Sequence, residues 1–261
     1  MHKNIPIFFQ FLARDFYTYK SRAFTYIINY CLIYPALFAI SIGYIQSNVL
    51  FGANTTQSST LFIGHILTIM LVVANILNIG LLFDLENNRF IDYQIMLLPP
   101  RLVLFERIIF ASLFTFLITL PFFPVAKLIL GDSFTTNNAS WLMTYLILYV
   151  GSLCCAAYTL FVVCTIKSSR TLRSFWMRIN FSLITFGGLF IPWMVTKKFS
   201  SILGYLILLN PLLYITEGLR SAILNDPQYI QAPICIAALL VFSIFFTLLA
   251  WHYFKKRVDH I

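Results

Sequence analysis

Long stretches without charge are the feature that most constrains this sequence. From Ala23 to Phe83 the chain contains no Asp, Glu, Lys or Arg. A transmembrane helix needs about 20 apolar residues, so this stretch is long enough for two spans, divided at the polar segments 46–48 and 54–60. Only 10% of all residues are charged and 60% are apolar, against roughly 25% and 45–50% in soluble domains. This composition excludes a soluble enzyme, a secreted disulfide scaffold, a disordered tail and a nucleic-acid-binding domain, and it predicts a protein of the lipid bilayer.

The charge-free runs predict an all-α membrane protein with six transmembrane helices. The predicted spans are residues 23–45, 60–83, 105–127, 140–166, 179–196 and 232–254. Six spans place both termini on one side, and of the 18 Lys and Arg residues only Lys127, Lys197, Lys198 and Arg220 then fall on the other side. Because Lys and Arg concentrate in cytoplasmic loops, we expect cytoplasmic termini in a bacterial inner membrane.

Residues 1–22 predict an amphipathic helix at the membrane interface. Apolar side chains recur there at helical spacing, and cations occupy other positions, as in Ile5, Phe8, Phe9, Leu12, Phe16 and Tyr19 against Arg14, Lys20 and Arg22. This pattern is typical of a helix that lies among lipid head groups. A signal peptide would instead place one unbroken apolar run after its first charges.

Residues 199–231 predict a re-entrant helical hairpin before the last span. The charge-free stretch from Phe199 to Thr216 could form a seventh span, but the tail 255–257 would then lie outside, against the positive-inside rule. Asn210-Pro211 is typical of a helix start, with Asn as cap and Pro in the first turn. Non-helical backbone at membrane depth is tolerated only inside protein or beside a wet cavity. We therefore expect this element at the transport path or its gate.

The motifs of soluble catalysis and metal binding are missing from the sequence. There is no G-x-x-x-x-G-K-[ST] for ATP, no G-x-S-x-G and no paired metal-ligand spacing. His65 lies alone in a predicted span and is expected to be a core or interface residue. The five cysteines fall within apolar runs and are expected to be small buried hydrophobes. We therefore predict no catalytic residue, no metal and no cofactor in this chain itself.

Residues 84–104 form an unusually charged segment between the second and third predicted spans. Asp84, Glu86 and Asp92 lie there, and Glu106 and Arg107 follow directly. The stretch 90–98 is too apolar for a merely solvated loop, which is the alternative, and Pro99-Pro100 stops it. Such a segment suits docking onto a cytoplasmic partner.

Three features together resemble the ABC-2 type permeases, the membrane subunits of ABC exporters. Six spans follow an interfacial helix, and an acidic loop leads through Pro99-Pro100-Arg101 into the third span. The third feature is Asn210-Pro-Leu-Leu-Tyr-Ile-Thr-Glu-Gly-Leu-Arg220, which is similar to the family's Asn-Pro…Glu-Gly-hydrophobic-Arg signature. Asn87-Asn88 and Leu98 depart from the small residues that the family often has in its loop. The resemblance covers essentially the whole chain, 1–261, as one transmembrane domain.

The resemblance implies partners and a coupling surface. Two separate ATPase subunits would carry ATP and Mg²⁺, a second permease copy (as a homodimer or with a related permease) would complete the path, and membrane lipids would surround it; no nucleic-acid partner is implied. The residues expected to couple the ATPases to the spans are Asp84, Glu86, Arg89, Asp92, Arg101 and Arg14.

Two further groups are candidates for the transport path and its gate. Tyr26, Tyr30, Tyr34 and Phe38 lie four residues apart and predict an aromatic stripe, either a slide for sugar rings or interhelical packing. Asn75 and Asn78 would contact cargo or join helices by hydrogen bonds. An outer gate is expected at Asn210, Pro211, Tyr214, Glu217 and Arg220. Glu217 and Arg220 are spaced to pair, the alternative being simple exposure at the outer surface.

The expected function is export of an amphipathic, glycan-containing or lipid-like substrate, with a cationic drug as a further alternative. The rival from a different class is an ATP-independent channel or carrier in which 199–231 is the selectivity element. The lack of an evident internal repeat argues against an inverted-repeat carrier.

Overall fold

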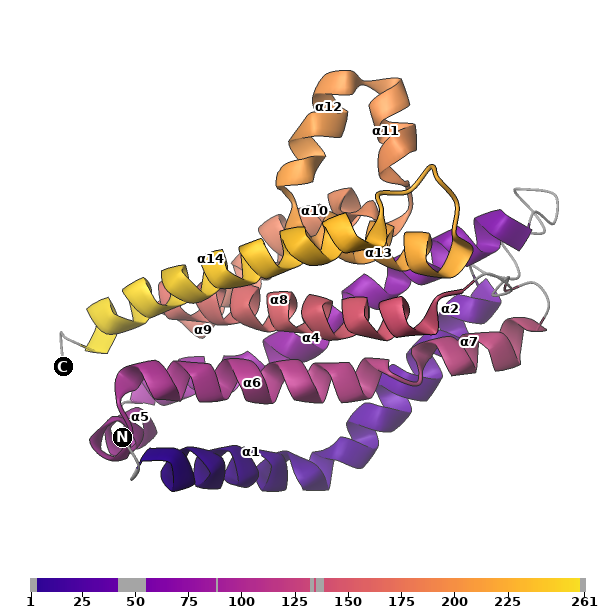
Figure 1. Ribbon diagram of the computed structural model, residues 1–261. Coiled ribbons are helices and arrows are strands. Elements are labelled where there is room, and N and C mark those ends of the chain that lie inside the picture. Colours follow the sequence, from indigo (N-terminus) through magenta and orange to yellow (C-terminus); the bar gives the residue numbers. More distant parts are fainter. Residues whose placement is uncertain (1–3, 42–54, 88, 132–133, 135–138, 259–261) are drawn as a thin grey trace.

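The computed structural model describes residues 4–41, 55–87, 89–131, 134 and 139–258, and all regular structure among them is helical (Figure 1). Short π-helical (η1, η4, η5) and 3-10 (η6) segments interrupt the α-helices. In chain order the elements are α1 (Asn4–Tyr26), η1 (Ile27–Ile33), α2 (Tyr34–Phe38), α4 (Thr55–Asn87), α5 (Arg89–Leu97), α6 (Pro100–Thr119), α7 (Phe122–Leu130), α8 (Trp141–Thr165), α9 (Ser169–Phe175), η4 (Trp176–Asn180), α10 (Phe181–Ile184), η5 (Thr185–Leu189), α11 (Trp193–Phe199), α12 (Ser201–Leu206), η6 (Ile207–Leu209), α13 (Pro211–Leu224) and α14 (Ala232–Val258).

Five segments are long and apolar enough to cross a membrane without a sharp bend: Phe24–Ser41, Ser59–Leu85, Pro100–Leu130, Trp141–Thr165 and Ala232–Val258. Two further pairs of helices are sharply bent. Ser169–Leu189 meets Trp193–Phe199 at 95°, and Ser201–Leu209 meets Pro211–Leu224 at 102°. With Ser169–Leu189 as the fifth span, the helices match the predicted six-span, all-α fold with a bent element before the last span.

Helix α8 lies at the centre of the bundle and packs against α4, α6, α13 and α14. It is the most buried of these five spans, because 78% of its most apolar stretch is buried inside the protein. Small residues on α8, including Gly151, Ser152 and the run Cys154–Ala157, let neighbouring helices approach closely. As predicted, Cys154, Cys155, Cys164 and Cys235 are buried free thiols; the side chain of Cys31 lies outside the described residues.

Several predicted boundaries are wrong, the fifth span most of all. It begins at Ser169 rather than 179 and ends at Leu189 rather than 196. Arg170, Arg173 and Arg178 precede the predicted span, yet they lie on the exposed side of the helix. The helix stops because Gly188 adopts a left-handed backbone (φ +80°), a conformation that glycine reaches without strain, and Pro192 follows.

Two other segments also differ from expectation. The third span is broken between Thr119 and Phe122, at Pro121. The segment 84–104 is mostly helical rather than a loop, because α4 continues to Asn87 and α5 precedes the Pro99-Pro100 stop. The polar break at 46–48 lies outside the described residues, as does Asn54.

Helix α1 is continuous with the first span through the π-helical segment η1. Its apolar face packs along α6, with the rings of Phe16 and Phe110 edge to face at 5.0 Å between centroids. Whether α1 lies at a membrane interface stays a prediction.

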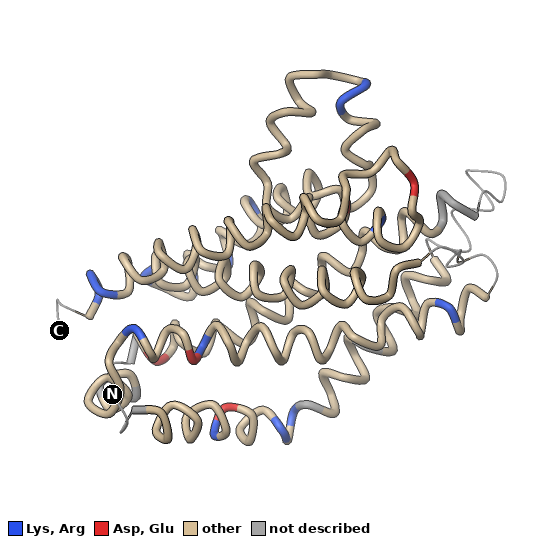
Figure 2. Tube along the Cα trace, in the orientation of Figure 1, with Lys and Arg blue, Asp and Glu red and all other residues tan. Residues whose placement is uncertain are grey.

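Both chain ends and α5 lie at one end of the bundle, here named the terminal end; α7 and the start of α14 lie at the opposite, far end (Figure 1). Most cations gather toward the terminal end (Figure 2), in the distribution expected if that end is cytoplasmic. The α11–α12 hairpin projects sideways from the bundle between the two sharp bends (Figure 1).

Candidate functional sites at the two ends of the bundle

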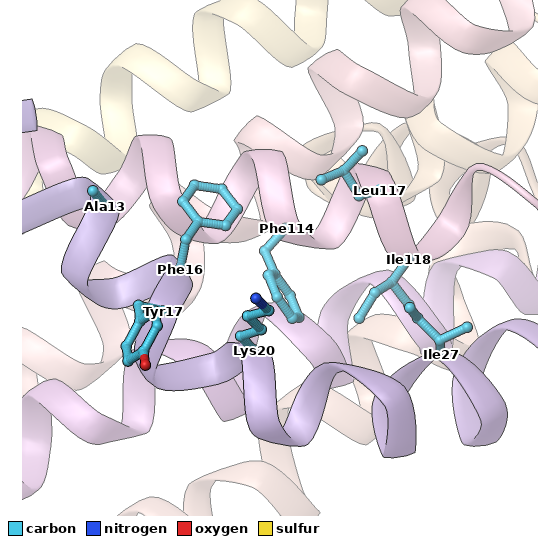
Figure 3. A pocket seen from close by; sticks show the side chains of 8 residues that line it. All are labelled: Ala13, Phe16, Tyr17, Lys20, Ile27, Phe114, Leu117 and Ile118. Carbon is cyan, nitrogen blue, oxygen red and sulfur yellow. The ribbon is translucent and has the colours of Figure 1, made fainter.

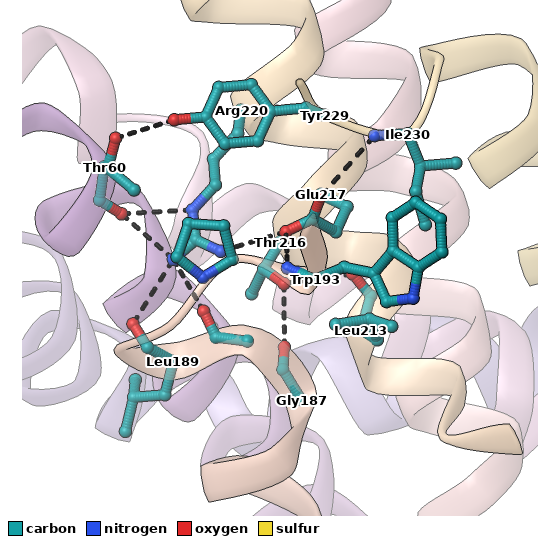
Figure 4. A network of polar contacts seen from close by, with 12 residues as sticks. Thr60, Gly187, Leu189, Trp193, Leu213, Thr216, Glu217, Arg220, Tyr229 and Ile230 are labelled. Atoms are coloured by element: carbon teal, nitrogen blue, oxygen red, sulfur yellow. Dashed lines mark hydrogen bonds and ion pairs between the residues drawn. The ribbon is translucent and has the colours of Figure 1, made fainter. Parts of the chain in front are cut away.

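The far end is organised by one fully buried arginine, Arg220 on α13 (Figure 4). Its guanidinium donates to the carbonyl of Thr60 on α4 at 3.1 and 3.2 Å and to the carbonyls of Gly188 and Leu189 at 2.6 and 3.4 Å. It also pairs with the carboxylate of Glu217 at 3.3 Å. One side chain therefore joins α13 to α4 and to the backbone of the first sharp bend.

Glu217 completes this far-end network from the other side. Its carboxylate accepts hydrogen bonds from the backbone N–H of Trp193 at 3.0 Å and of Ile230 at 3.5 Å. The predicted pairing of Glu217 with Arg220 is confirmed, and the alternative of simple surface exposure is wrong, because both side chains are 0% exposed. The ion pair thus holds the start of α11 and the linker before α14 in place.

The second bend has its own polar supports. Asn210 caps α13 through its side-chain oxygen, which accepts from Leu212 N–H at 3.1 Å, and its amide donates to the Leu183 carbonyl at 2.7 Å. The predicted Asn-Pro helix start is therefore confirmed. Tyr214 donates to the Leu208 carbonyl at 2.9 Å. All five predicted gate residues lie at or next to the bends, while their role as a gate stays a proposal.

Sequence reasoning missed three members of the far-end network: Thr60, Tyr229 and Thr216. The hydroxyls of Thr60 and Tyr229 lie 2.9 Å apart and join the start of α4 to the linker before α14. Thr216 donates to the Gly187 carbonyl at 2.7 Å. The Gly187-Gly188 pair followed by Pro192 was the available sequence signal for the bend; no local pattern marks Thr60 or Tyr229.

The terminal end is organised around a second arginine, Arg107 on α6. It forms ion pairs with Asp15 of α1 at 3.3 Å and with Asp84 of α4 at 3.2 Å. It also lies 3.5 Å from the side-chain oxygen of Gln94 on α5. Two predicted coupling residues take part, because Asp84 pairs with Arg107 and Arg14 pairs with Asp15. This terminal-end cluster connects four helices.

Glu106, which was not among the predicted coupling residues, also lies in this cluster. It is 1% exposed, and neither of its carboxylate oxygens has a hydrogen bond within the described part of the chain. Its closest cation is Arg107, at 3.8 Å. The cluster therefore brings three carboxylates, Asp15, Asp84 and Glu106, around one central guanidinium.

Arg101, another predicted coupling residue, does not join the cluster. Arg101 is exposed, and its guanidinium lies 5.1 Å from the ring centroid of Trp251 on α14. The side chains of Glu86, Arg89 and Asp92 lie outside the described residues.

Helix α5 presents an apolar surface at the terminal end. Tyr93, Met96 and Leu97 are 54%, 84% and 39% exposed. A cavity of about 350 Å³ lies between α5 and α1, lined by Ile7, Gln10, Phe11, Arg14, Tyr93 and Leu97. The segment is thus neither a solvated loop nor part of the bundle core.

The predicted aromatic stripe exists as a ladder of rings. Tyr26, Tyr30, Tyr34 and Phe38 follow one another with centroid spacings of 6.1, 5.6 and 5.9 Å. Tyr26 also packs edge to face on Phe114 of α6 at 6.2 Å, whereas Tyr34 is 44% exposed. Packing and cargo contact both fit these positions.

The two asparagines that the sequence singles out on α4 have different surroundings. Asn78 is buried and donates to the Ala156 carbonyl at 3.1 Å and to the Thr159 hydroxyl at 2.7 Å, both on α8. It joins the two helices, as one of the two sequence interpretations proposed. Asn75 is half-buried and makes no side-chain hydrogen bond with the described residues.

A larger cavity, of about 520 Å³, opens between α1 and α6 beside the ladder (Figure 3). Its walls are Ala13, Phe16, Tyr17, Lys20, Ile27, Phe114, Leu117 and Ile118. One lysine among otherwise mostly apolar walls suits an amphiphilic molecule. Among the described residues, no group of three or more His, Cys, Asp or Glu could hold a metal ion.

A comparison with protein families identifies the family of the chain. The model of the ABC-2 type transporter membrane domain matches residues 7–224. The chain belongs to the ABC-2 type transporter family. No curated protein and no solved structure matches it. This ABC-2 protein is thus a multi-pass membrane permease, and in such transporters ATP binding generally lies on partner ATPases.

Proposed function

We propose that this ABC-2 permease forms the transport path of an ATP-driven exporter and is powered by two separate ATPase subunits that dock at its terminal end. Both termini then face the cytoplasm of a bacterial cell, and a second permease copy completes the path in the inner membrane. The exposed apolar surface of α5 carries this proposal.

The α5 surface has the chemistry of a docking site. Met96 is 84% exposed and lies near Tyr93 and Leu97, at the end of the bundle where most cations gather. A contiguous apolar patch on an aqueous end of a membrane protein is costly unless a partner covers it. The adjoining cavity between α5 and α1 would receive side chains of that partner.

The terminal-end cluster supports transmission from such a partner. Arg107 joins α6 to α1 through Asp15 and to α4 through Asp84, and it lies beside Gln94 of α5. A displacement of α5 would therefore be passed to three other helices through one side chain. This is coupling between two sites through a contiguous set of contacts.

The cargo proposed is amphipathic, with a glycan-containing or lipid-like part. The aromatic ladder offers ring faces along the first span, and the 520 Å³ cavity beside it joins apolar walls to Lys20. Both features fit a molecule with a polar head and an apolar body better than a small cation.

A matched pair of variants tests the docking surface. Met96 on α5 and Leu128 on α7 are both 84% exposed, at opposite ends of the bundle. We expect a tagged wild-type chain, purified gently from its native membrane, to bring down a stoichiometric P-loop ATPase. Met96→Glu should lower the recovered ATPase about tenfold or more, whereas Leu128→Glu should leave it unchanged.

The same purification decides between the two classes of function. If no nucleotide-binding protein accompanies the wild-type chain, the ATP-driven proposal fails and the channel or carrier alternative replaces it. If an ATPase is recovered equally with Met96→Glu, the docking surface lies elsewhere than α5.

A further inference from the structure

His65 on α4 is a buried polar side chain without a polar partner. It is 4% exposed, and neither ring nitrogen has a hydrogen bond within the described residues. Its ring stacks on Phe38 at 4.0 Å between centroids and 17° between planes, and Phe190 meets it edge to face at 5.9 Å. Leaving such a group unsatisfied is costly, so its presence requires an explanation.

The position of His65 on its helix shows what covers it. Leu61, Thr68, Val72, Asn75 and Ile79 are partly exposed and follow one another at helical spacing along one face of α4. His65 belongs to this half-open face by its spacing. It is buried because Phe38 and Phe190 lie against it. Removing one ring would open His65 onto the same face as Thr68 and Asn75.

The two covering rings lie next to π-helical backbone. Phe38 ends α2, which follows the π-helical segment η1, and Phe190 directly follows the π-helical segment η5. Single π-helical turns are often found at functional sites. Phe38 is also the last ring of the ladder, so His65 lies where the ladder ends.

We propose that His65 binds a hydroxyl-bearing ring, the sugar of a glycan-containing cargo, when Phe38 moves off its face. This inference rests on the proposed function and assigns that function's cargo to a histidine that is not among the predicted path residues. Phe38 then covers the imidazole in the absence of cargo and occupies the place that a sugar ring takes.

The chemistry favours a sugar over the other parts of an amphiphile. A neutral imidazole has one N–H donor and one acceptor nitrogen, which matches hydroxyls that both donate and accept. An acyl chain would gain nothing from either nitrogen. The nearby Arg220 is already engaged by Glu217 and by three backbone carbonyls, so a phosphate would find no free cation there.

The test compares two lipids that differ only in the sugar. The tagged chain is isolated with the proteins that accompany it and placed in nanodiscs containing either a monoglycosyl diacylglycerol or the same diacylglycerol without sugar. Native mass spectrometry measures the bound fraction of each lipid, without nucleotide and with Mg-ATP and vanadate. The wild type should prefer the glycosylated lipid in at least one of these states.

Three variants isolate the imidazole nitrogens. His65→Phe keeps an aromatic ring for stacking on Phe38 and should reduce the preference for the glycosylated lipid by about tenfold. His65→Asn keeps a donor and an acceptor and should retain part of the preference. His252→Phe, at an exposed position near the end of α14, is the matched control and should behave as wild type. Melting temperatures confirm that each variant is folded.

Two outcomes overturn the proposal. One is a wild-type protein without preference for the sugar in either nucleotide state; the other is a folded His65→Phe variant whose preference equals that of wild type. Recovery of the ATPase is scored in the same preparations, so a failed sugar site with an ATPase present leaves the exporter function standing.

Discussion

The two ends of the bundle each bury an arginine among carboxylates and carbonyls, yet they satisfy it differently. At the far end Arg220 and Glu217 are fully buried, and neither has a buried side-chain atom without a partner in the described chain. At the terminal end Glu106 has no hydrogen bond with the described residues, and Arg107 Nε and one oxygen of Asp15 have none there either. A fully satisfied buried network fixes one arrangement, whereas a partly satisfied one leaves alternatives close in energy. The far end is therefore the rigid joint and the terminal end the adjustable one.

This contrast fits the proposed division of labour. The adjustable cluster lies beside the proposed ATPase surface on α5, where a change of state has to be received. The rigid network holds the two bends beside the α11–α12 hairpin. The four predictions below test the contrast, from the largest expected effect to the smallest.

Removing each central arginine is the strongest test. Arg220→Met leaves a buried carboxylate and three carbonyls without their donor, so it should lower the free energy of unfolding by about 3–5 kcal/mol. Arg107→Met should cost less, because Asp15 keeps a second cation, Arg14, and the side chain of Asp84 is 30% exposed to screening water. Unfolding of both variants by SDS in mixed micelles gives the two values; equal losses would contradict the contrast.

Changing Glu to Gln should affect the free energy of unfolding differently at two buried glutamates. Glu217→Gln leaves Arg220 without its counter-ion and should lower the free energy of unfolding by about 3 kcal/mol. Glu106→Gln replaces a buried carboxyl group that no hydrogen bond within the described residues satisfies, so stability should stay unchanged or rise by up to about 1 kcal/mol. The SDS titration used for the arginines measures both. A clear loss of stability in Glu106→Gln would show that its carboxylate is better satisfied than the geometry indicates.

Two glycines on α4 compare the packing toward each end. A Cβ at Gly64 would overlap the carbonyl of Leu189 in the first bend, whereas a Cβ at Gly80 would find its nearest neighbour, the Tyr19 hydroxyl, at 3.7 Å. Gly64→Ala should therefore destabilise by about 2 kcal/mol, and Gly80→Ala should stabilise by up to about 1 kcal/mol through helix propensity. Melting temperatures in detergent suffice to read the two signs. An unchanged melting temperature for Gly64→Ala would mean that the backbone of the first bend can move away from the added Cβ.

The smallest expected effect lies between the ends. Asn78→Val removes two hydrogen bonds from α4 to α8 and should cost about 0.6–1 kcal/mol, the usual range inside membranes. Asn75→Val is the control: it removes no such bond and should leave stability within error of wild type. If Asn75→Val lost more stability than Asn78→Val, Asn78 would not be the residue that holds α4 to α8.

The sequence predicted what depends on local pattern. Charge-free runs located the spans, the Asn210-Pro211 pair marked the start of α13, and the spacing of Glu217 and Arg220 implied that they pair. The predicted fifth span starts too late because the charge-free run begins only after Arg178, whereas the helix already includes Arg170, Arg173 and Arg178. Long basic side chains on an exposed helix face can extend to head groups, so their charge does not end a helix.

What depends on distant contacts could not be predicted. Asp15 and Arg107 are brought together only when α1 packs along α6, and Thr60 meets Arg220 only when α4 packs on α13. A lone His65 in an apolar span carried no sign that both of its nitrogens would lack partners. The ring pair that buries it, Phe38 and Phe190, comes from two segments far apart in the chain.

The span of the Thr60–Arg220 contact has a consequence for how the permease is made. The two residues are 160 positions apart, so α4 is synthesised and inserted long before α13 leaves the ribosome. Until α13 has been synthesised, the carbonyls of Thr60, Gly188 and Leu189 have no guanidinium to accept from. Glu217, one helical turn away, lets the arginine enter the bilayer with its counter-ion beside it, which lessens the cost of an unpaired charge. Locking of the far end is therefore one of the last events of assembly, and a chain cut short before α13 would insert its earlier spans without closing that joint.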